Sequence, residues 1–462
     1  VQTCALPISK TLDGLVRDFP DQIRYSYAPS RKDSRWLPFA TQLRLSLDYW
    51  RYLDARYDHS PSLRARGASQ APALASTLTS GAFRSRAVLG LLKGVTAAVE
   101  RAVPYDTRIE AFLRAEQPDL LLLTPLLYFG SQQVDYVRAA KALGIRTALG
   151  VGSWDHLTTK GVIHEHPDHV LVWNEAQRTE AGELHGIPAS RVTVTGAQAY
   201  DHWFVQQPTL SREAFSAKVG VPADRPLLLY LCSSPFITPH EVPFVRRWID
   251  AVRRAPDPQV RRAAIVIRPH PQNAEQWADF DASSSEAVGV WPRAGANPVD
   301  TEARADYYDS MFYSVAVVGV NTSALIESGI VGRQVYTVLV DEFAGQQEGT
   351  LHFQHLKNVN GGLLTTAASL DEHVAQLAEA VARGAVRDPK SRAFIESFVR
   401  PYGFDVPAAD RFVAAIEAQR AAPAPAPRRP GVASRLVRRL LLPLALTASA
   451  AARRRRSERK AT

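Results

Sequence analysis

The sequence predicts an α/β protein with two doubly wound parallel-sheet domains that face a cleft, followed by a basic helical tail. Short apolar runs alternate with helical segments from residue 118 onward, as in parallel sheets with right-handed crossovers. A chain of 462 residues exceeds what one core serves, and 46% hydrophobic residues supply enough apolar side chains for two cores. Prolines and polar residues between 206 and 226 mark the crossing between the domains.

The chain divides into five segments. Residues 1–8, VQTCALPI, resemble the translation of a common sequencing-adapter oligonucleotide, so we expect them to be foreign to the protein. Residues 9–205 form the first domain, which on this hypothesis lacks its natural start and an opening central strand. Residues 206–420 form the second domain, 421–431 a Pro/Ala linker, and 432–462 a basic amphipathic tail.

Apolar periodicity places the elements of both domains. The first domain opens with a mostly helical stretch, in which apolar and charged residues alternate at helical spacing: Leu43, Leu47, Trp50 and Leu53, with Arg44, Asp48, Arg51 and Asp54 between them. Strands of its sheet are predicted at 119–124, 145–149, 169–173 and 191–195. Strands of the second sheet are predicted at 227–232, 263–268, 288–291, 315–320 and 334–340. Helices are predicted at 241–254, 369–383 and 410–420, the last packing back across the cleft.

The formal net charge of +9 comes from the tail. Residues 428–460 hold eleven Arg or Lys and one acid, Glu458, which leaves the rest of the chain with a net charge of −1. A specific nucleic-acid partner is therefore not expected. The two cysteines, Cys4 and Cys232, give no disulfide framework and fit a reducing cytoplasm.

The stretch from Ser314 to Val340 is the most informative one. A buried strand is followed by Asn321, Thr322 and Ser323, residue types that cap helix N-termini, and then by a short helix and another strand. Open parallel sheets bind ligands at this end of their strands, and helix N–H groups favour anions. Glu327 shares a helix face with Ser323. The alternative interpretation is a plain cap and a solvated glutamate.

In the first domain, the loop GVGSWDHLTTKG carries Asp155 and His156, either of which could take a proton from an attacking hydroxyl group. The alternative is a turn in which Asp155 accepts local backbone hydrogen bonds. A dense group of His and acid side chains follows at 164–169. It raises the question of a metal, but no helical HExxH motif or cysteine partner accompanies it, so we expect no metal.

In the second domain, polar residues also follow predicted strands. Ser233 and Ser234 follow one strand, and Arg268 to Asn273 (RPHPQN) follow another. Arginine suits bidentate contact with phosphate oxygens, and His270 can add a donor. A loop rich in acids and amides, 341–348, follows the last predicted strand. P-loop and dinucleotide-binding glycine motifs are absent from the sequence.

Three segments follow one another in a telling order: VTGAQAYD (194–201), IRPHPQN (267–273) and VVGVNTSALIESGIVGRQV (317–335). In this order they resemble the GT-B glycosyltransferase superfamily, whose members have two Rossmann-like domains. The match is to bacterial surface-carbohydrate transferases, related to UDP-GlcNAc 2-epimerases and CDP-glycerol glycerophosphotransferases. The polar turn after Val320 departs from the epimerase pattern, as does the lack of that family's paired acids. The resemblance implies a donor-binding set in the second domain: Ser233, Ser234, Arg268, His270, Asn321, Thr322, Ser323, Glu327, Glu342, Gln346 and Gln347.

The expectation is a metal-independent glycosyltransferase that needs no cofactor and moves a sugar from a nucleotide-sugar donor to a surface polysaccharide or glycolipid. Asp155 or His156 is its expected base. The alternatives are a CDP-glycerol or ribitol-type phosphotransferase, an enzyme like UDP-GlcNAc 2-epimerase, and a non-catalytic membrane-tethered scaffold.

The tail predicts a location at the inner face of the cell membrane. Residues 432–446 are predicted to place five apolar side chains on one helical face beside arginines: Val432, Leu436, Leu440, Leu441 and Leu444. The uncharged run 440–452 is shorter than the roughly 20 residues a spanning helix needs. We therefore expect residues 432–460 to contact an anionic membrane surface as an interfacial helix. The alternative is a disordered soluble tail, because Pro443 interrupts the helix.

Overall fold

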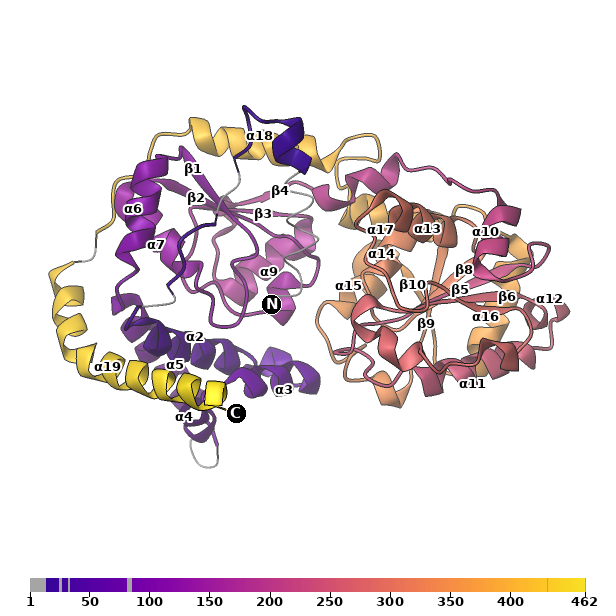
Figure 1. Cartoon of the computed structure of the whole chain (residues 1–462), viewed down its shortest axis with the longest axis horizontal. Helices are drawn as coiled ribbons and strands as arrows, with labels where there is room; N and C mark the ends of the chain where they lie inside the picture. Colours follow the sequence, from indigo (N-terminus) through magenta and orange to yellow (C-terminus); the bar gives the residue numbers. More distant parts are fainter. Residues whose placement is uncertain (1–13, 25–26, 32–33, 81–84, 430, 462) are drawn as a thin grey trace.

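The computed structural model describes residues 14–24, 27–31, 34–80, 85–429 and 431–461 and contains two α/β domains that lie side by side (Figure 1). The expectation about residues 1–8 lies outside the described residues. Each domain has its own parallel sheet with helices on both faces, which confirms the predicted fold class.

The sheet of the first domain contains four parallel strands in the order β1-β2-β3-β4. Within the described residues, no strand precedes β1, and the segment before it is helical. The strands are β1 (Leu120–Leu123), β2 (Arg146–Gly150), β3 (His169–Val172) and β4 (Val192–Val194). The helices of this domain are α2 (Leu37–Arg51), α3 (Pro61–Gln70), α4 (Ala73–Thr77), α5 (Arg86–Ala102), α6 (Thr107–Glu116), α7 (Val134–Leu143), α8 (His156–Thr159) and α9 (Glu175–His185).

The sheet of the second domain contains six parallel strands in the order β10-β9-β8-β5-β6-β7. They are β5 (Leu227–Leu231), β6 (Ala264–Arg268), β7 (Val288–Val290), β8 (Ala316–Gly319), β9 (Gln334–Val338) and β10 (Leu364–Ala367). The helices are α10 (Arg212–Val219), α11 (Val242–Arg253), α12 (Pro258–Arg261), α13 (Thr301–Phe312), α14 (Ala324–Ile330), α15 (Phe353–Asn358), α16 (Leu370–Arg383) and α17 (Pro389–Phe398). The strand order reverses between β5 and β8, which creates a topological switch point there.

The core of the second domain follows from the apolar run of β5. Leu227, Leu229 and Leu231 face one hydrophobic cluster, whereas Leu228 and Tyr230 face the other. All five side chains are buried because successive strand residues point to opposite faces and helices cover both. An uninterrupted apolar run is therefore what this central strand requires.

The chain crosses between the domains twice, and the two crossings are joined. Asp201 lies in the first crossing, and its carboxylate accepts a 2.7 Å hydrogen bond from the guanidinium of Arg400 in the second. The same carboxylate accepts the backbone N–H groups of Ala408 and Ala409 at 3.0 and 2.7 Å. A separate contact joins the domains at α9 and α15, where Glu180 Oε1 lies 2.5 Å from His355 Nε2.

The helix α18 (Ala408–Ala421) returns to the first domain, as expected for 410–420. Gly150 of β2 leaves room for the ring of Phe412, because a Cβ there would lie 3.1 Å from Phe412 Cζ. The Pro/Ala linker after α18 has no regular structure up to residue 429, and Arg428 N–H donates to Lys141 O at 2.8 Å.

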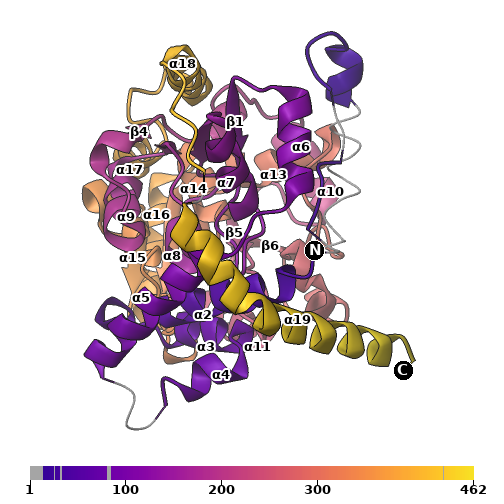
Figure 2. The ribbon, with the colours of Figure 1, turned by 90° about the vertical axis from the view of Figure 1, so that its left-hand side faces the viewer.

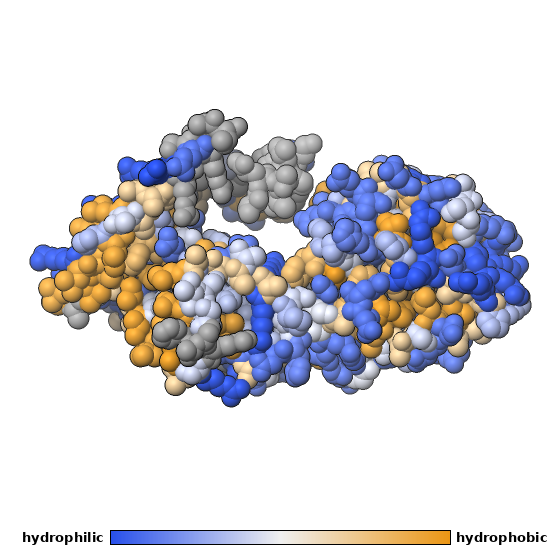
Figure 3. Space-filling model, turned by 90° about the horizontal axis from the view of Figure 1, so that it is seen from below, coloured by the Kyte–Doolittle hydropathy of each residue, from blue (hydrophilic) through white to orange (hydrophobic). Residues whose placement is uncertain are grey.

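The tail forms the helix α19 (Val432–Ala461), which lies across α2 and α5 and extends beyond them (Figures 1 and 2). Leu441, Leu442 and Ala445 pack against Trp36 and Ala40 of the α2 region. Seen from below, hydrophobic side chains gather over α19 and α5 on the left of the molecule (Figure 3). Across the described residues, no helix has both the length and the hydropathy needed to cross a membrane.

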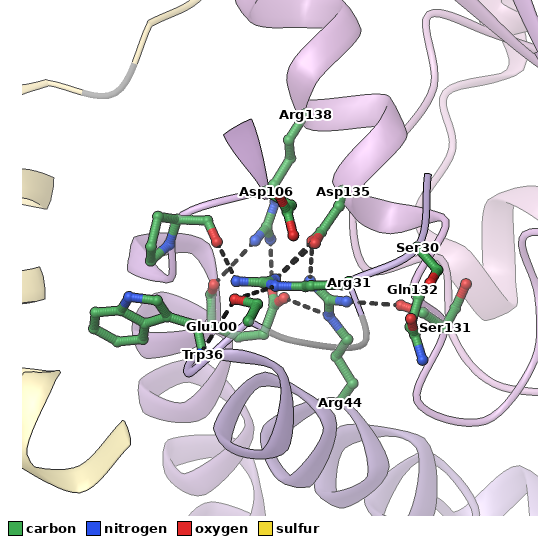
Figure 4. Close-up of polar contacts among 12 residues, drawn as sticks. Ser30, Arg31, Trp36, Arg44, Glu100, Asp106, Ser131, Gln132, Asp135 and Arg138 are labelled. Atoms are coloured by element: carbon green, nitrogen blue, oxygen red, sulfur yellow. Dashed lines mark hydrogen bonds and ion pairs between the residues drawn. The ribbon is translucent and has the colours of Figure 1, made fainter. Parts of the chain in front are cut away.

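The charged residues of α2 are buried as fully as its apolar ones. Arg44 Nε donates to Glu100 of α5 at 2.8 Å, and Arg44 Nη2 donates to Asp135 of α7 at 2.9 Å (Figure 4). Arg138 of α7 and Arg31 complete the network, with contacts of 2.5 Å to Glu100 and 2.7 Å to Asp135. Burial alone would raise the pKa of Glu100, but Arg138 and Arg44 lower it to about 2. This buried ionic network joins α2 and α5 to α7, which packs against β2 of the sheet.

Replacing Arg44 by Met should destabilise the chain by about 3–5 kcal/mol, because two buried carboxylates lose a shared cation. Urea denaturation measures the free energy of unfolding. Arg114→Met is the matched control: Arg114 pairs with Glu110 at 2.7 Å on the exposed surface of α6, so its loss should cost less than about 1 kcal/mol. Equal effects of the two substitutions would contradict a structural role for the network.

Candidate functional site

Two adjoining cavities, each of about 300 Å³, lie at the carboxyl ends of the two sheets and share Ser153 and Ser323 as lining residues. One, here called the basic cavity, is lined by residues that include Arg66, Lys160, His270, Asn321, Thr322 and His352. The other, here called the aromatic cavity, is lined by residues that include Trp173, Tyr200, Trp203, Tyr307 and Glu327. Both domains contribute to each cavity, so the two cavities form one continuous cleft.

The switch point forms the second-domain wall of the basic cavity. Ser234 lines it, whereas Ser233 is buried behind it. Ser233 Oγ accepts the N–H of Asn321 at 3.4 Å, and its own N–H donates to Glu241 at 3.0 Å. Burial raises the pKa of Glu241 to about 8. Ser233 therefore holds the ends of β5 and β8 together, and its neighbour faces the cavity.

All three residues of the polar turn after β8 line the basic cavity. Of these, Thr322 Oγ1 accepts the N–H of Ala324 at 3.4 Å, while Ser323 makes no side-chain cap. Asn321 Nδ2 donates to Gln346 O at 2.6 Å and thereby fixes the loop after β9. The sequence predicted a capped helix start, and the structure assigns the capping hydrogen bond to Thr322 alone.

The loop 341–348 serves the cleft mainly through its backbone. Gln346 contributes its carbonyl group to Asn321. Gln347 is buried, and its Nε2 donates to Thr337 Oγ1 and Val338 O at 3.0 Å each. Glu342 lies outside both cavities, where it pairs with Arg247 at 2.7 Å. The sequence predicts that the side chains of Gln347 and Glu342 contact a donor. In the structure they bond instead to β9 and to Arg247, respectively.

Glu327 lines the aromatic cavity and accepts a 2.5 Å hydrogen bond from the hydroxyl group of Tyr307. Burial raises the pKa of Glu327 to about 7, although Tyr307 and Arg268 oppose the rise. The Tyr307 ring meets Trp203 edge-on, with 5.5 Å between centroids. This carboxyl group thus lies among aromatic rings, with its pKa raised into the neutral range.

Arg268 lies behind this wall rather than in it. Its guanidinium carbon is 4.8 Å from the centroid of the Tyr307 ring, and its Nη1 is 3.5 Å from Asp306 O. Burial lowers the pKa of Arg268 to about 10, so it remains a cation at neutral pH. Arg268, which the sequence predicts to contact donor phosphates, therefore influences the cleft through its positive charge and through the Tyr307 ring that it contacts.

The basic cavity has two cationic side chains on its first-domain wall and a histidine opposite them, whose pKa is lowered by burial. His270 and Gln272 lie on the second-domain wall, and Lys160 and Arg66 on the opposite one. Lys160 belongs to the first-domain loop 150–161, in which the sequence predicts only Asp155 and His156 as functional residues. Arg66 of α3 follows no motif, and its guanidinium carbon lies 4.5 Å from the Phe236 ring centroid. Its place in the cleft depends on how α3 packs, which sequence patterns do not report.

Asp155 lines the basic cavity, and both of its carboxylate oxygens are held. Oδ1 accepts from Ser153 Oγ at 2.5 Å and Oδ2 from Thr159 Oγ1 at 2.9 Å. Burial raises the pKa of Asp155, but His352, Lys160 and the Ser153 hydrogen bond outweigh this and lower it to about 2. The carboxylate is therefore ionised and fixed in orientation.

Two histidines lie near Asp155. His156 follows it, but lines neither cavity, and its Nδ1 is buried without a hydrogen-bond partner among the described residues. Burial lowers the pKa of His156. His352, which the sequence did not single out, meets Trp154 edge-on at 4.9 Å between ring centroids. Burial lowers its pKa to about 4, so the His352 ring is uncharged at neutral pH.

The His and acid residues of 164–169 have separate structural partners. His164 Nε2 lies 3.0 Å from Asp48, Glu165 pairs with Lys141 at 2.6 Å, and His169 Nε2 lies 2.7 Å from Thr193 Oγ1. Over the described ranges, no group of three or more His, Cys, Asp or Glu side chains is placed to hold a metal ion.

No protein-family model matches the sequence, and no curated protein matches it. Solved structures similar to this chain include UDP-GlcNAc 2-epimerase from Methanocaldococcus jannaschii, with 14% identity, a TM-score of 0.44 and coverage of 70% of this chain and 82% of that one. A putative epimerase of this kind from Listeria monocytogenes has 17% identity, a TM-score of 0.44 and coverages of 69% and 78%. The wall teichoic acid polymerase TagF has 11% identity, a TM-score of 0.33 and coverages of 54% and 57%. At these values, functional conclusions must come from the cleft itself.

The pKa of Glu327 predicts a pH-dependent stability. Because folding raises this pKa from near 4.5 to about 7, the folded state binds a proton that the unfolded state releases, and stability falls as pH rises through that window. Relative to Glu327→Gln, the wild type should lose about 1–3 kcal/mol of unfolding free energy between pH 5 and pH 8. Glu241 contributes equally to both proteins. Parallel pH profiles from urea denaturation would contradict this prediction.

Proposed function

We propose that the chain is a glycosyltransferase that moves a sugar from a nucleotide-sugar donor to a surface polysaccharide or glycolipid acceptor. The observation that supports it is the pair of cavities at the switch point, one aromatic with a carboxyl group and one basic, which share Ser153 and Ser323. A nucleotide has the same division: a flat base with a hydroxylated ribose, and then a charged diphosphate.

The aromatic cavity suits the nucleoside. Trp203 and Tyr307 offer ring faces and edges to a base, and Glu327 can accept hydrogen bonds from ribose hydroxyl groups. The Tyr307 hydroxyl occupies one acceptor position on Oε2, which leaves Oε1 and the second position on Oε2 for these bonds. A diol that donates to both carboxylate oxygens favours the ionised form of this group, so nucleoside binding should release part of a proton at neutral pH.

The basic cavity suits the diphosphate and the sugar. Lys160 and Arg66 on one wall and His270 on the other surround the space in front of Thr322 and Ser323. Two cations together with hydroxyl and N–H donors can balance the charge that develops on a leaving diphosphate, which is how a metal-independent transferase would stabilise its transition state.

The acceptor would enter on the side of the first-domain loop. Asp155 is ionised and rigidly oriented by Ser153 and Thr159, so it can receive the proton of an acceptor hydroxyl group. A pKa of about 2 makes it a weak base, and it would take the proton late, as the bond to the sugar forms. His156 is the alternative base.

Nucleotide binding tests the proposal first. A thermal-shift screen against nucleotides should identify the base, and calorimetry should then separate the two cavities. Glu327→Ala should weaken the nucleoside and its diphosphate about equally, by roughly 10-fold or more, whereas His270→Ala should weaken the diphosphate more. Glu342→Ala, which lies outside the cleft, is the control and should change neither. Unchanged affinity in Glu327→Ala would overturn the assignment of the aromatic cavity.

Product analysis separates the proposal from the alternatives. Release of a nucleoside diphosphate that depends on an acceptor supports glycosyl transfer. Release of CMP indicates a phosphotransferase, interconversion of sugar epimers without an acceptor indicates an epimerase, and binding without turnover indicates a scaffold.

Substituting Asp155 by Asn should abolish turnover while donor affinity stays within about 3-fold, since the shape is kept and the basicity is lost. The pH dependence distinguishes the two candidate bases. With Asp155 as the base, kcat should not fall between pH 8 and pH 4 through loss of the base, because its pKa is about 2. A protonation limb in that range that disappears in His156→Gln would assign the role to His156.

A further inference from the structure

The helix α19 has two apolar faces, and only one of them is used within the fold. Leu441, Leu442 and Ala445 pack on the α2 region. A second set at four-residue spacing, Val432, Leu436, Leu440 and Leu444, points to solvent, with 56% to 78% of each residue exposed. Large aliphatic side chains this exposed, in a regular row, are unusual on a protein surface and mark a contact region.

The neighbouring helix α5 continues this apolar surface. Leu91 and Val95 are 68% and 55% exposed, and Gly90 and Gly94 beside them have open space around their Cα atoms. Arg438 of α19 donates to Ala102 O of α5 at 2.7 Å, so the two helices are in direct contact. In Figure 3 the hydrophobic areas over α19 and α5 adjoin on one face of the molecule.

The charges on this surface have one sign. Arg435 and Arg439 are exposed between the outward leucines of α19. The one acid of α5, Glu100, is buried in the ionic network, and the one acid of α19, Glu458, lies far along the helix beside Arg454. The apolar row of α19 therefore has arginines for neighbours, and among the described residues of these two helices no carboxylate is exposed beside either row. On α5, Lys93 pairs with Asp54 at 2.8 Å.

We propose that α19 and α5 together form a surface that binds an anionic lipid bilayer. Leucine and valine side chains at this exposure can enter the acyl boundary, while the long arginine side chains reach the phosphates of the headgroups. Charge complementarity selects the bilayer over a second copy of the chain, which would bring arginine rows face to face. The surface is more than a detached tail, because α5 belongs to the folded domain. This proposal does not depend on the proposed function.

The surface is rigidly connected to the cleft through α2. On one side α2 carries α19 and α5, and on the other Arg51 Nη1 donates to Lys160 O and Gly161 O at 3.0 Å each. Tyr52 OH also donates to Lys160 O at 2.7 Å. A bilayer bound at α19 and α5 therefore holds the first-domain wall of the basic cavity at a fixed distance and orientation.

Flotation of the full chain with vesicles tests this. Wild-type protein should float with phosphatidylcholine vesicles containing about one third phosphatidylglycerol at low salt, and lose most of that binding at roughly 0.5 M salt. It should bind pure phosphatidylcholine weakly. Leu436→Ser/Leu440→Ser on α19 and Leu91→Ser/Val95→Ser on α5 should each weaken binding at least about 10-fold. The control Val413→Ser changes an apolar residue of α18 that is 58% exposed and should bind as the wild type does.

Three outcomes would overturn the proposal. If the α5 variant binds as the wild type does while the α19 variant fails, the tail acts alone and the composite surface is wrong. Equal binding to both vesicle types would remove the anionic requirement. If light scattering shows a dimer that the same double variants dissociate, and vesicles do not bind, then the surface joins two copies. Thermal unfolding of each variant confirms that lost binding is not lost folding.

Discussion

The buried ionic network around Arg44 is the interaction on which the first domain depends. Four charged residues from three helices and Arg31 from the preceding segment meet in a space that excludes water, and each charge has an opposite partner. Such networks add little net stability over an apolar core, but they tolerate only one arrangement, since a shift of one helix leaves a charge unpaired. The network therefore fixes α2, α5 and α7 in register, and with them both the wall of the cleft and the outer surface.

The sequence predicts the sheet layers well because buried parallel strands must be continuous apolar runs, as in β5. The strand β10 was not predicted, since its two central threonines are half-buried at a sheet edge and break the apolar run. In α2 the helical period is correct, but the pattern does not reveal that Arg44, Asp48 and Arg51 are buried. Their burial depends on partners roughly fifty to over a hundred residues away, such as Glu100 and Gly161, which no local pattern reports.

In the candidate site, too, local sequence patterns predict some features and tertiary contacts decide the others. Loops after the strands were predicted to meet at the cleft, and Ser234, His270, Asn321 and Asp155 do so. Within each loop, the sequence does not say which of two neighbours faces the cavity. Ser233 and Gln347 point into the protein because the ends of the strands need polar partners there. Arg268 stacks on Tyr307, and His352 arrives from a loop with no motif, so these roles depend on tertiary packing alone.

The clasp between Asp201 and Arg400 limits how the two domains can move. Two covalent crossings tied together at one point leave the domains little freedom to slide past each other. Further contacts between the domains lie away from the clasp, at Glu180 with His355 and at Trp154 with His352. A ligand that bridges both walls of the basic cavity adds a further contact between the two domains. Fluorescent labels placed on the two domains would therefore report whether filling the cleft changes the distance between them, whichever ligand fills it.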